Sequence, residues 1–353
     1  MSNDATPGEE FRDDLRPLPT PSASPRAGAG NAAARRLLSN AELAPLTELS
    51  NARSLAAVAL TFGVIAAAIA FGVWAWPSPW LLLSVLAVGV QQHALFILAH
   101  ESAHYRLFRS RAANDAVGRA IGMASGISMC TYRVIHRLHH NNLYTEEDPD
   151  TAIHGGYPRG VGYLWKKLAQ DFAGLNAWKT FAYFFGAPAI NAATNRVTRP
   201  LDDTSEALRA SARRDRWAVV AVQLAMPLLA WALGGGPALA QYAVFWLLPL
   251  LTVLQPILRL RAIAEHGAVT DLSSPLTAAR CNNSTGSLGN WLGRALIFPH
   301  HVNYHLEHHL YPAVPHYRLP ALHRLLQDKG ALAGAEVRDV ADTLRTVFAR
   351  RRA

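Results

Sequence analysis

Cysteine is scarce in this chain of 353 residues, which contains only Cys130 and Cys281. The two form no Cys-x-x-Cys pair, so neither a disulfide framework nor a thiolate metal site is expected. A His-Pro-Gly-Gly sequence is also missing, which argues against a fused haem domain of that kind. Both cysteines are therefore predicted to be ordinary packing residues.

Positive charge is missing from two long stretches. None of the 34 lysines and arginines lies in residues 54–99 or 217–258, although the net charge is +9. Apolar residues make up 50% of the chain, while polar stretches hold the mean hydropathy at +0.07. This pattern is typical of an integral membrane protein with much of its mass outside the lipid. Its basic parts suit an anionic cytoplasmic membrane surface better than nucleic acid.

Four apolar segments have 17 to 22 residues each, within the range of about 17–25 apolar residues that cross a hydrocarbon core of roughly 30 Å. Uncharged turns at 77–79 and 234–237 join them into two hairpins, and basic residues flank the other ends. The positive-inside rule then puts both turns outside and both chain termini in the cytosol. The predicted crossings are residues 55–76, 80–99, 217–233 and 241–258.

The remaining parts are expected to lie in the cytosol or at the membrane surface. Residues 1–48 have the composition of a disordered tail. They contain no signal-peptide pattern, so the first apolar segment is expected to be kept as an anchor. Residues 49–330 predict the membrane domain and its helical cap, with an interfacial or buried helix at 112–131 and surface helices within 160–216. Residues 331–353 predict an amphipathic helix, packed on the cap or lying on lipid, and a basic tail. The expected fold is all-α, with four transmembrane helices in two hairpins and a cytosolic helical cap.

Histidines gather in three short motifs, which we call box one (residues 100–104), box two (136–140) and box three (305–309). Within each box they are spaced i, i+3 or i+4, which places them on one face of a helix. His266, like box one, follows a returning crossing. The candidate metal ligands are His100, His104, His136, His139, His140, His266, His305, His308 and His309. Imidazole suits iron, zinc, copper or nickel, and this number of donors is enough for two ions with positions left for dioxygen or water.

Further polar residues are candidates for supporting roles. Carboxylates that could accept the second ring N–H of a ligating histidine, or be plain surface groups, are Glu101, Asp148, Asp150, Glu265 and Glu307. His301 could reach the metal site, but we expect it to contact the ligands or to lie on the surface rather than to bind the metal. His300 and His316 are expected in the polar cap. His93 lies inside the second crossing, where we expect a neutral, hydrogen-bonded histidine that lines the substrate slot rather than a metal ligand.

The boxes resemble those of the membrane fatty acid desaturases, a superfamily of non-haem di-iron enzymes that includes hydroxylases and carotenoid oxygenases. Box three is followed by Leu310-Tyr311-Pro312 and box two by Asp148-Pro149-Asp150, as is common there. The resemblance implies that the box histidines, with His266 as a further ligand, hold two iron ions that use dioxygen. It also implies that hydrogen is removed from a lipid acyl chain to leave a double bond, with electrons from a separate ferredoxin-like or cytochrome-like donor. The expected location is the inner membrane of a bacterium.

Other functions are compatible with the same residues. A lipid or carotenoid hydroxylase or ketolase would use the same site and differ only after the first hydrogen is removed. A haem-binding membrane electron carrier would instead place histidines inside facing transmembrane helices, where only His93 is predicted. A lipid-binding protein without catalysis would keep the boxes as structure alone.

Overall fold

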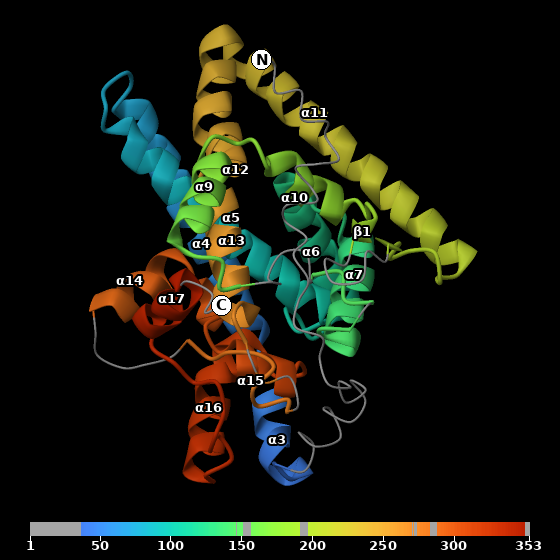
Figure 1. Ribbon diagram of the computed structural model, residues 1–353. Helices are drawn as coiled ribbons and strands as arrows, with labels where there is room; N and C mark the ends of the chain where they lie inside the picture. Colours follow the sequence, from blue (N-terminus) through green and yellow to red (C-terminus); the bar gives the residue numbers. More distant parts are fainter. Residues whose placement is uncertain are drawn as a thin grey trace, which may run out of the picture.

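The computed structural model describes residues 37–145, 147–150, 157–190, 197–269, 271, 274–282 and 288–349. In these parts the chain is mainly helical (Figure 1). The α-helices are α3 (Asn40–Thr47), α4 (Asn51–Trp74), α5 (Leu81–Ala103), α6 (Arg111–Ser125), α7 (Met129–Asn142), α9 (Val161–Phe172), α10 (Ala177–Phe184), α11 (Glu206–Tyr242), α12 (Leu248–Leu251), α13 (Leu254–His266), α14 (Leu288–Leu296), α15 (His305–Leu310), α16 (Leu319–Asp328) and α17 (Val340–Phe348). The shorter elements are the π-helix η1 (Ala243–Leu247), the 3-10 helices η2 (Pro299–His301) and η3 (His316–Arg318), and the antiparallel strands β1 (Ala189–Ile190) and β2 (Val197–Thr198).

Helices α4 and α5 form an antiparallel pair of membrane length. They have 24 and 23 residues, and both are strongly apolar. The outer face of α4 exposes large side chains such as Leu55 and Leu60, as a lipid-facing helix does. Most of α5 is buried instead, because helices pack on it from several sides, and Gly89 allows Val253 to approach it closely. Helix α5 is therefore the central element of the apolar layer.

A third apolar segment runs through α11, η1, α12 and α13, from Glu206 to His266. Its backbone departs from helical geometry at Gly234 and Gly235. Figure 1 shows the yellow α11 meeting the orange part of the chain at this end, where the direction reverses. The π-helix η1 follows, and the carbonyl of Trp246 within it accepts a hydrogen bond of 2.8 Å from the Gln92 side chain of α5. This polar contact joins the third segment to the central helix.

The helical fold and its membrane-length apolar segments agree with the sequence-based expectation. Within the described part of the chain, three segments satisfy the length and composition of a membrane span, at 51–74, 81–103 and within 206–266. The reversal at Gly234 and Gly235 lies within the turn predicted for the second hairpin. It remains a prediction that this third segment crosses the membrane twice. The cytosolic location of the cap and the limits of the domains also remain predictions.

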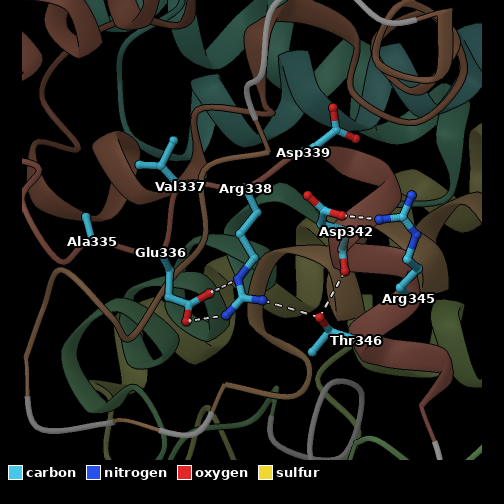
Figure 2. A pocket seen from close by; sticks show the side chains of 8 residues that line it. All are labelled: Ala335, Glu336, Val337, Arg338, Asp339, Asp342, Arg345 and Thr346. Carbon is cyan, nitrogen blue, oxygen red and sulfur yellow. Dashed lines mark hydrogen bonds and ion pairs between the residues drawn. The ribbon is translucent and has the colours of Figure 1, made fainter.

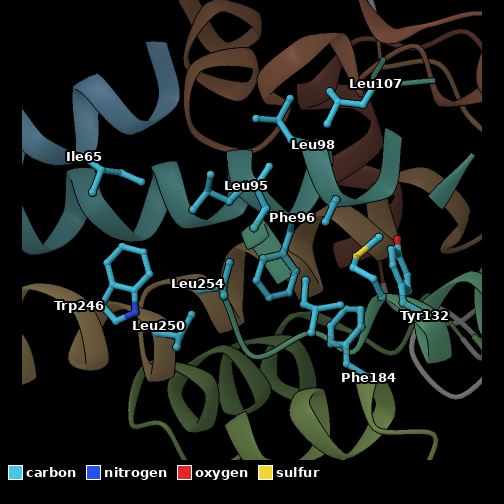
Figure 3. Packing of buried hydrophobic residues seen from close by; sticks show 14 of the residues in the cluster. Ile65, Leu95, Phe96, Leu98, Leu107, Tyr132, Phe184, Trp246, Leu250 and Leu254 are labelled. Carbon is cyan, nitrogen blue, oxygen red and sulfur yellow. The ribbon is translucent and has the colours of Figure 1, made fainter. Parts of the chain in front are cut away.

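A hydrophobic core on one side of α5 joins the apolar layer to the helices around it. Figure 3 shows Leu95 and Phe96 of α5 packed between residues of the third apolar segment and of α10. The rings of Phe96 and Phe184 meet edge to face, with centroids 5.3 Å apart. Because this core continues to Tyr132 in α7, it holds the helix of box two against the end of α5.

The two ends of the described chain pack on the body of the protein. Residues 40–47 form α3, which differs from the disordered tail expected for 1–48, while residues 1–36 lie outside the described part. Ser39 and Glu42 cap this helix reciprocally, and Leu46 is buried in the cluster that contains α15 and α16. At the other end, Val347 of α17 is buried against α9 and α13, so this amphipathic helix packs on neighbouring helices.

Close packing of α6 on α5 gives a test of the fold. A Cβ atom at Gly118 would lie 1.8 Å from the Ser102 hydroxyl oxygen, which is held by a hydrogen bond to the Asn114 carbonyl. We expect Gly118→Ala to lower the free energy of unfolding by roughly 1–3 kcal/mol through overpacking, measured as a fall in the thermal unfolding midpoint in detergent. Gly63→Ala is the control, because nothing lies within 4 Å of that position. An equal response of the two variants would contradict this packing.

Candidate metal centre

The three boxes and His266 lie at helix ends that meet in one place. Box one occupies the last turn of α5 and its C-terminal capping residue, and His266 is the last residue of α13. Box two lies on α7, which the core holds against α5. Box three makes up most of the short helix α15. Two helices of the apolar layer and two helices beside it therefore present their histidines to one another.

The nine predicted ligands form two groups of ring nitrogens. Within each group, one ring nitrogen from every histidine lies within 4.8 Å of those from all the others. The five-histidine group consists of His100, His104, His136, His140 and His308, and the four-histidine group of His139, His266, His305 and His309. Every predicted ligand thus belongs to one group, and none belongs to both.

The ring nitrogens converge closely within each group. In the five-histidine group, the Nε2 atoms of His104 and His136 are 2.7 Å apart. In the four-histidine group, the Nε2 atoms of His266 and His305 are 2.8 Å apart. Such convergence of imidazole nitrogens is the arrangement expected around a cation that several imidazoles bind together.

Burial makes the ring nitrogens of the five-histidine group poor bases and leaves some without hydrogen-bond partners. Both ring nitrogens of His100 are buried and lack a hydrogen-bond partner among the described residues, a costly arrangement unless a ligand is bound. Burial lowers the pKa of His136, His140 and His308 well below the usual value, and that of His104 to about 3. Neutral imidazoles with buried nitrogens fit a transition metal.

Carboxylates lie near the Nδ1 atoms of two histidines of the four-histidine group. The Nδ1 atom of His139 lies 3.0 Å from Asp148 and 3.5 Å from Asp150. Burial alone would lower the pKa of His139, but these two carboxylates raise it to about 9. The Nδ1 atom of His305 lies 3.5 Å from Glu265 without a hydrogen bond, and Glu265 accepts one from Arg261 instead. A carboxylate at Nδ1 leaves Nε2 for a metal and strengthens it as a donor.

Two of the other predicted carboxylates behave differently. Glu101 lies 3.6 Å from Nδ1 of His100, beyond hydrogen-bond distance, and accepts a bond from the backbone N–H of His316. Glu307 lies 2.5 Å from Nδ1 of His323, a residue outside both groups. Glu307 therefore supports α16 rather than a predicted ligand. The sulfur of Cys281, buried as predicted, lies 3.9 Å from the same nitrogen.

Tyr144 is a residue of the site that was not predicted from the sequence. Its hydroxyl donates to the Ala278 carbonyl at 2.8 Å and lies 3.4 Å from Nδ1 of His266. Its backbone N–H donates to Asp148, so one loop supports ligands of both box two and α13. The only signal in the sequence is an aromatic residue in the polar loop after box two, which has no specific spacing.

The remaining histidines named from the sequence stand outside both groups. His301 is exposed, which agrees with a surface position rather than a ligand. His300 and His316 lie with their rings 5.2 Å apart on η2 and η3. His93 is completely buried on α5.

A surface pocket near the C-terminal helix is separate from the histidine groups. Figure 2 shows that its charged side chains mostly pair with one another, as Arg338 does with Glu336 and Arg345 with Asp342. Its lining contains no histidine. The pocket therefore offers no donor set comparable with the two histidine groups.

The fold and the site define a class: a helical membrane protein with a candidate two-metal centre made only of histidines. The model of the fatty acid desaturase family matches residues 74–341. The chain therefore belongs to the fatty acid desaturase family, and its desaturase relatives make it an oxidoreductase.

Three relatives illustrate the range of this family. Dihydrorhizobitoxine desaturase of Bradyrhizobium elkanii is 28% identical over 73% of this chain and 69% of the relative. Beta-carotene ketolase of Paracoccus sp. (strain PC1) is 28% identical over 67% of this chain and 75% of the relative. An endoplasmic reticulum omega-6 fatty acid desaturase of Glycine max is 23% identical over 70% of this chain and 64% of the relative.

The contact between His139 and Asp148 gives a test of the site. Asp148 accepts bonds from two backbone N–H groups as well as from His139, which an amide cannot match. We expect Asp148→Asn to weaken iron retention about 10- to 100-fold in a chelator titration of purified protein. Asp202→Asn is the control, because that side chain is 63% exposed. Unchanged retention in Asp148→Asn would show that the carboxylate does not support a ligand.

Proposed function

We propose that the two histidine groups each hold one iron ion. The observation that carries this proposal is the division of the nine histidines into a group of five and a group of four, with converging nitrogens. Two non-haem irons bound by imidazoles supply the oxidation of unactivated C–H bonds by dioxygen. Membership of the fatty acid desaturase family supports iron over zinc or copper.

The protein's own groups orient this centre and keep it dry. Asp148 is hydrogen-bonded to Nδ1 of His139 in the four-histidine group, which fixes the orientation of that ring. The apolar core at Phe96 and Tyr132 packs beside box two and excludes water from that side. A dry, fixed environment suits a reaction in which one carbon of a chain must reach the centre.

The proposed reaction introduces a double bond into a lipid acyl chain. Two C–H bonds of adjacent carbons break and a C=C bond forms, while dioxygen takes up two electrons from the donor and two protons and leaves as two waters. The electrons are proposed to come from a separate ferredoxin-like or cytochrome-like protein. Family membership and membrane-length helices support a lipid substrate.

The same centre supports a second candidate function. Similarity to a beta-carotene ketolase favours oxygenation of a lipid or carotenoid, in which an oxygen atom is retained in the product.

We place the histidine boxes and both termini on the cytosolic side of a bacterial inner membrane, with two crossings in each hairpin. In this proposal residues 49–330 are the desaturase domain, and residues 331–353 are an amphipathic helix with a basic tail.

Product analysis distinguishes these functions. Lipids of cells that express the protein with an electron-donor system are compared, by mass spectrometry, with lipids of cells that lack it. Loss of two hydrogens from an acyl chain supports the desaturase, and gain of oxygen supports the hydroxylase or ketolase. An unchanged lipid profile, despite full iron loading and a functional donor, would contradict both.

Replacement of His139 tests whether the site performs the reaction. His139→Ala removes one donor of the four-histidine group together with its contact to Asp148. We expect no product from this variant, with normal amounts of protein in the membrane fraction. His301→Ala is the matched control, because His301 is exposed and outside both groups. Activity of His139→Ala near that of the unaltered protein would remove the four-histidine group from the mechanism.

A further inference from the structure

His93 is a buried polar residue with no partner among the described residues. It lies in the middle of the membrane-length helix α5, and its side chain is completely buried. Neither ring nitrogen has a hydrogen-bond partner within the described part of the chain. A polar group at this depth costs free energy unless something satisfies it, and such residues commonly mark a site of function.

The position of His93 on α5 defines what it faces. His93, Ile97 and Glu101 are spaced four residues apart and so follow one face of the helix. Ile97 packs with Phe298 in one apolar cluster, and Glu101 accepts a hydrogen bond from the backbone of His316. This face is therefore covered by the segment that contains η2 and η3, and His93 is its innermost polar member.

His300 belongs to η2, which packs on α5. The Thr61 hydroxyl on α4 donates to the Ala57 carbonyl, so it accepts from Nε2–H of His300 at 3.0 Å. A neutral His300 then keeps Nδ1 as an acceptor. Phe298, just before η2, packs with Ile97 on the face of α5 that carries His93, so His300 enters from the side on which His93 lies.

The backbone of η2 is unusual in a way that supports a functional role. His300 and His301 have φ of 52° and 61°, in the left-handed region that favours glycine. Strain of this kind persists where the surrounding structure holds it, and it is common at ligand sites. Here it turns the His300 ring toward Thr61 in the membrane helix.

We propose that Thr61, His93 and His300 form a polar subsite that binds an uncharged oxygen group, a hydroxyl or carbonyl, of the lipid substrate. The proposal rests on the proposed function, because it assigns the substrate to the same centre. His93 precedes His100 by seven residues, or two helical turns, which is roughly 10 Å along α5. An oxygen group held there fixes which carbon of the chain lies at the histidine groups. Imidazole suits either group, since its neutral form offers one donor and one acceptor.

Binding without turnover tests the subsite. Iron-loaded protein in detergent, kept without oxygen or electron donor, is titrated with octadecanoic acid and with its hydroxy and oxo derivatives at several chain positions. Displacement of a fluorescent octadecanoic acid analogue measures affinity. We expect at least one derivative to bind about 5- to 10-fold more tightly than octadecanoic acid, as one added hydrogen bond implies. His93→Leu should reduce this preference to within about twofold.

Further variants separate a binding role from a folding role. Thr61→Val keeps the shape of the side chain and removes the acceptor for His300, so it should reduce the same preference. His93→Gln keeps a donor and an acceptor and should retain part of it, while exposed His301→Leu should leave it unchanged. Equal affinity for all probes, or an unchanged preference in His93→Leu and Thr61→Val, would overturn the subsite. Because no turnover is measured, this result is independent of product analysis.

Discussion

The division of nine histidines between two groups depends on the angular spacing of the α-helix. At 100° per residue, position i+4 is offset from i by about 40° in one direction and position i+3 by about 60° in the other, so one face of the helix presents its histidines in two directions. In box two, His136 and His140 therefore enter the five-histidine group and His139 the four-histidine group. Box three is divided in the opposite sense, with His305 and His309 in the four-histidine group. The two boxes thus complete each other, and neither group forms unless α7 and α15 are correctly placed.

Helix α5 provides that placement. It is buried within the apolar layer and carries box one on its last turn, so the centre lies where the apolar layer ends. The hydrogen bond between Asp148 and Nδ1 of His139 offsets part of the cost of burying imidazoles together. The same helix, two turns deeper, carries His93, which connects the position of the metal centre with selection of the substrate.

The sequence identifies the candidate ligands, because local spacing and crossing order are visible in it. It does not reveal contacts between distant segments, such as Tyr144 beside His266 or Glu307 paired with His323. The helix at 40–47 was missed for the same reason, since Leu46 is buried in a cluster whose other members include Cys281 and Leu322, far along the chain. Backbone strain at His300 and the π-helix at 243–247 likewise result from packing and leave no periodic signal.

The metal content of the purified protein tests the central claim most directly. Protein from cells grown with ample iron is purified in detergent and examined by elemental analysis. Two groups of imidazoles predict about two irons per chain, and loss of about one iron in a variant of either group. One metal ion or fewer per chain, with all nine histidines intact, would contradict the account.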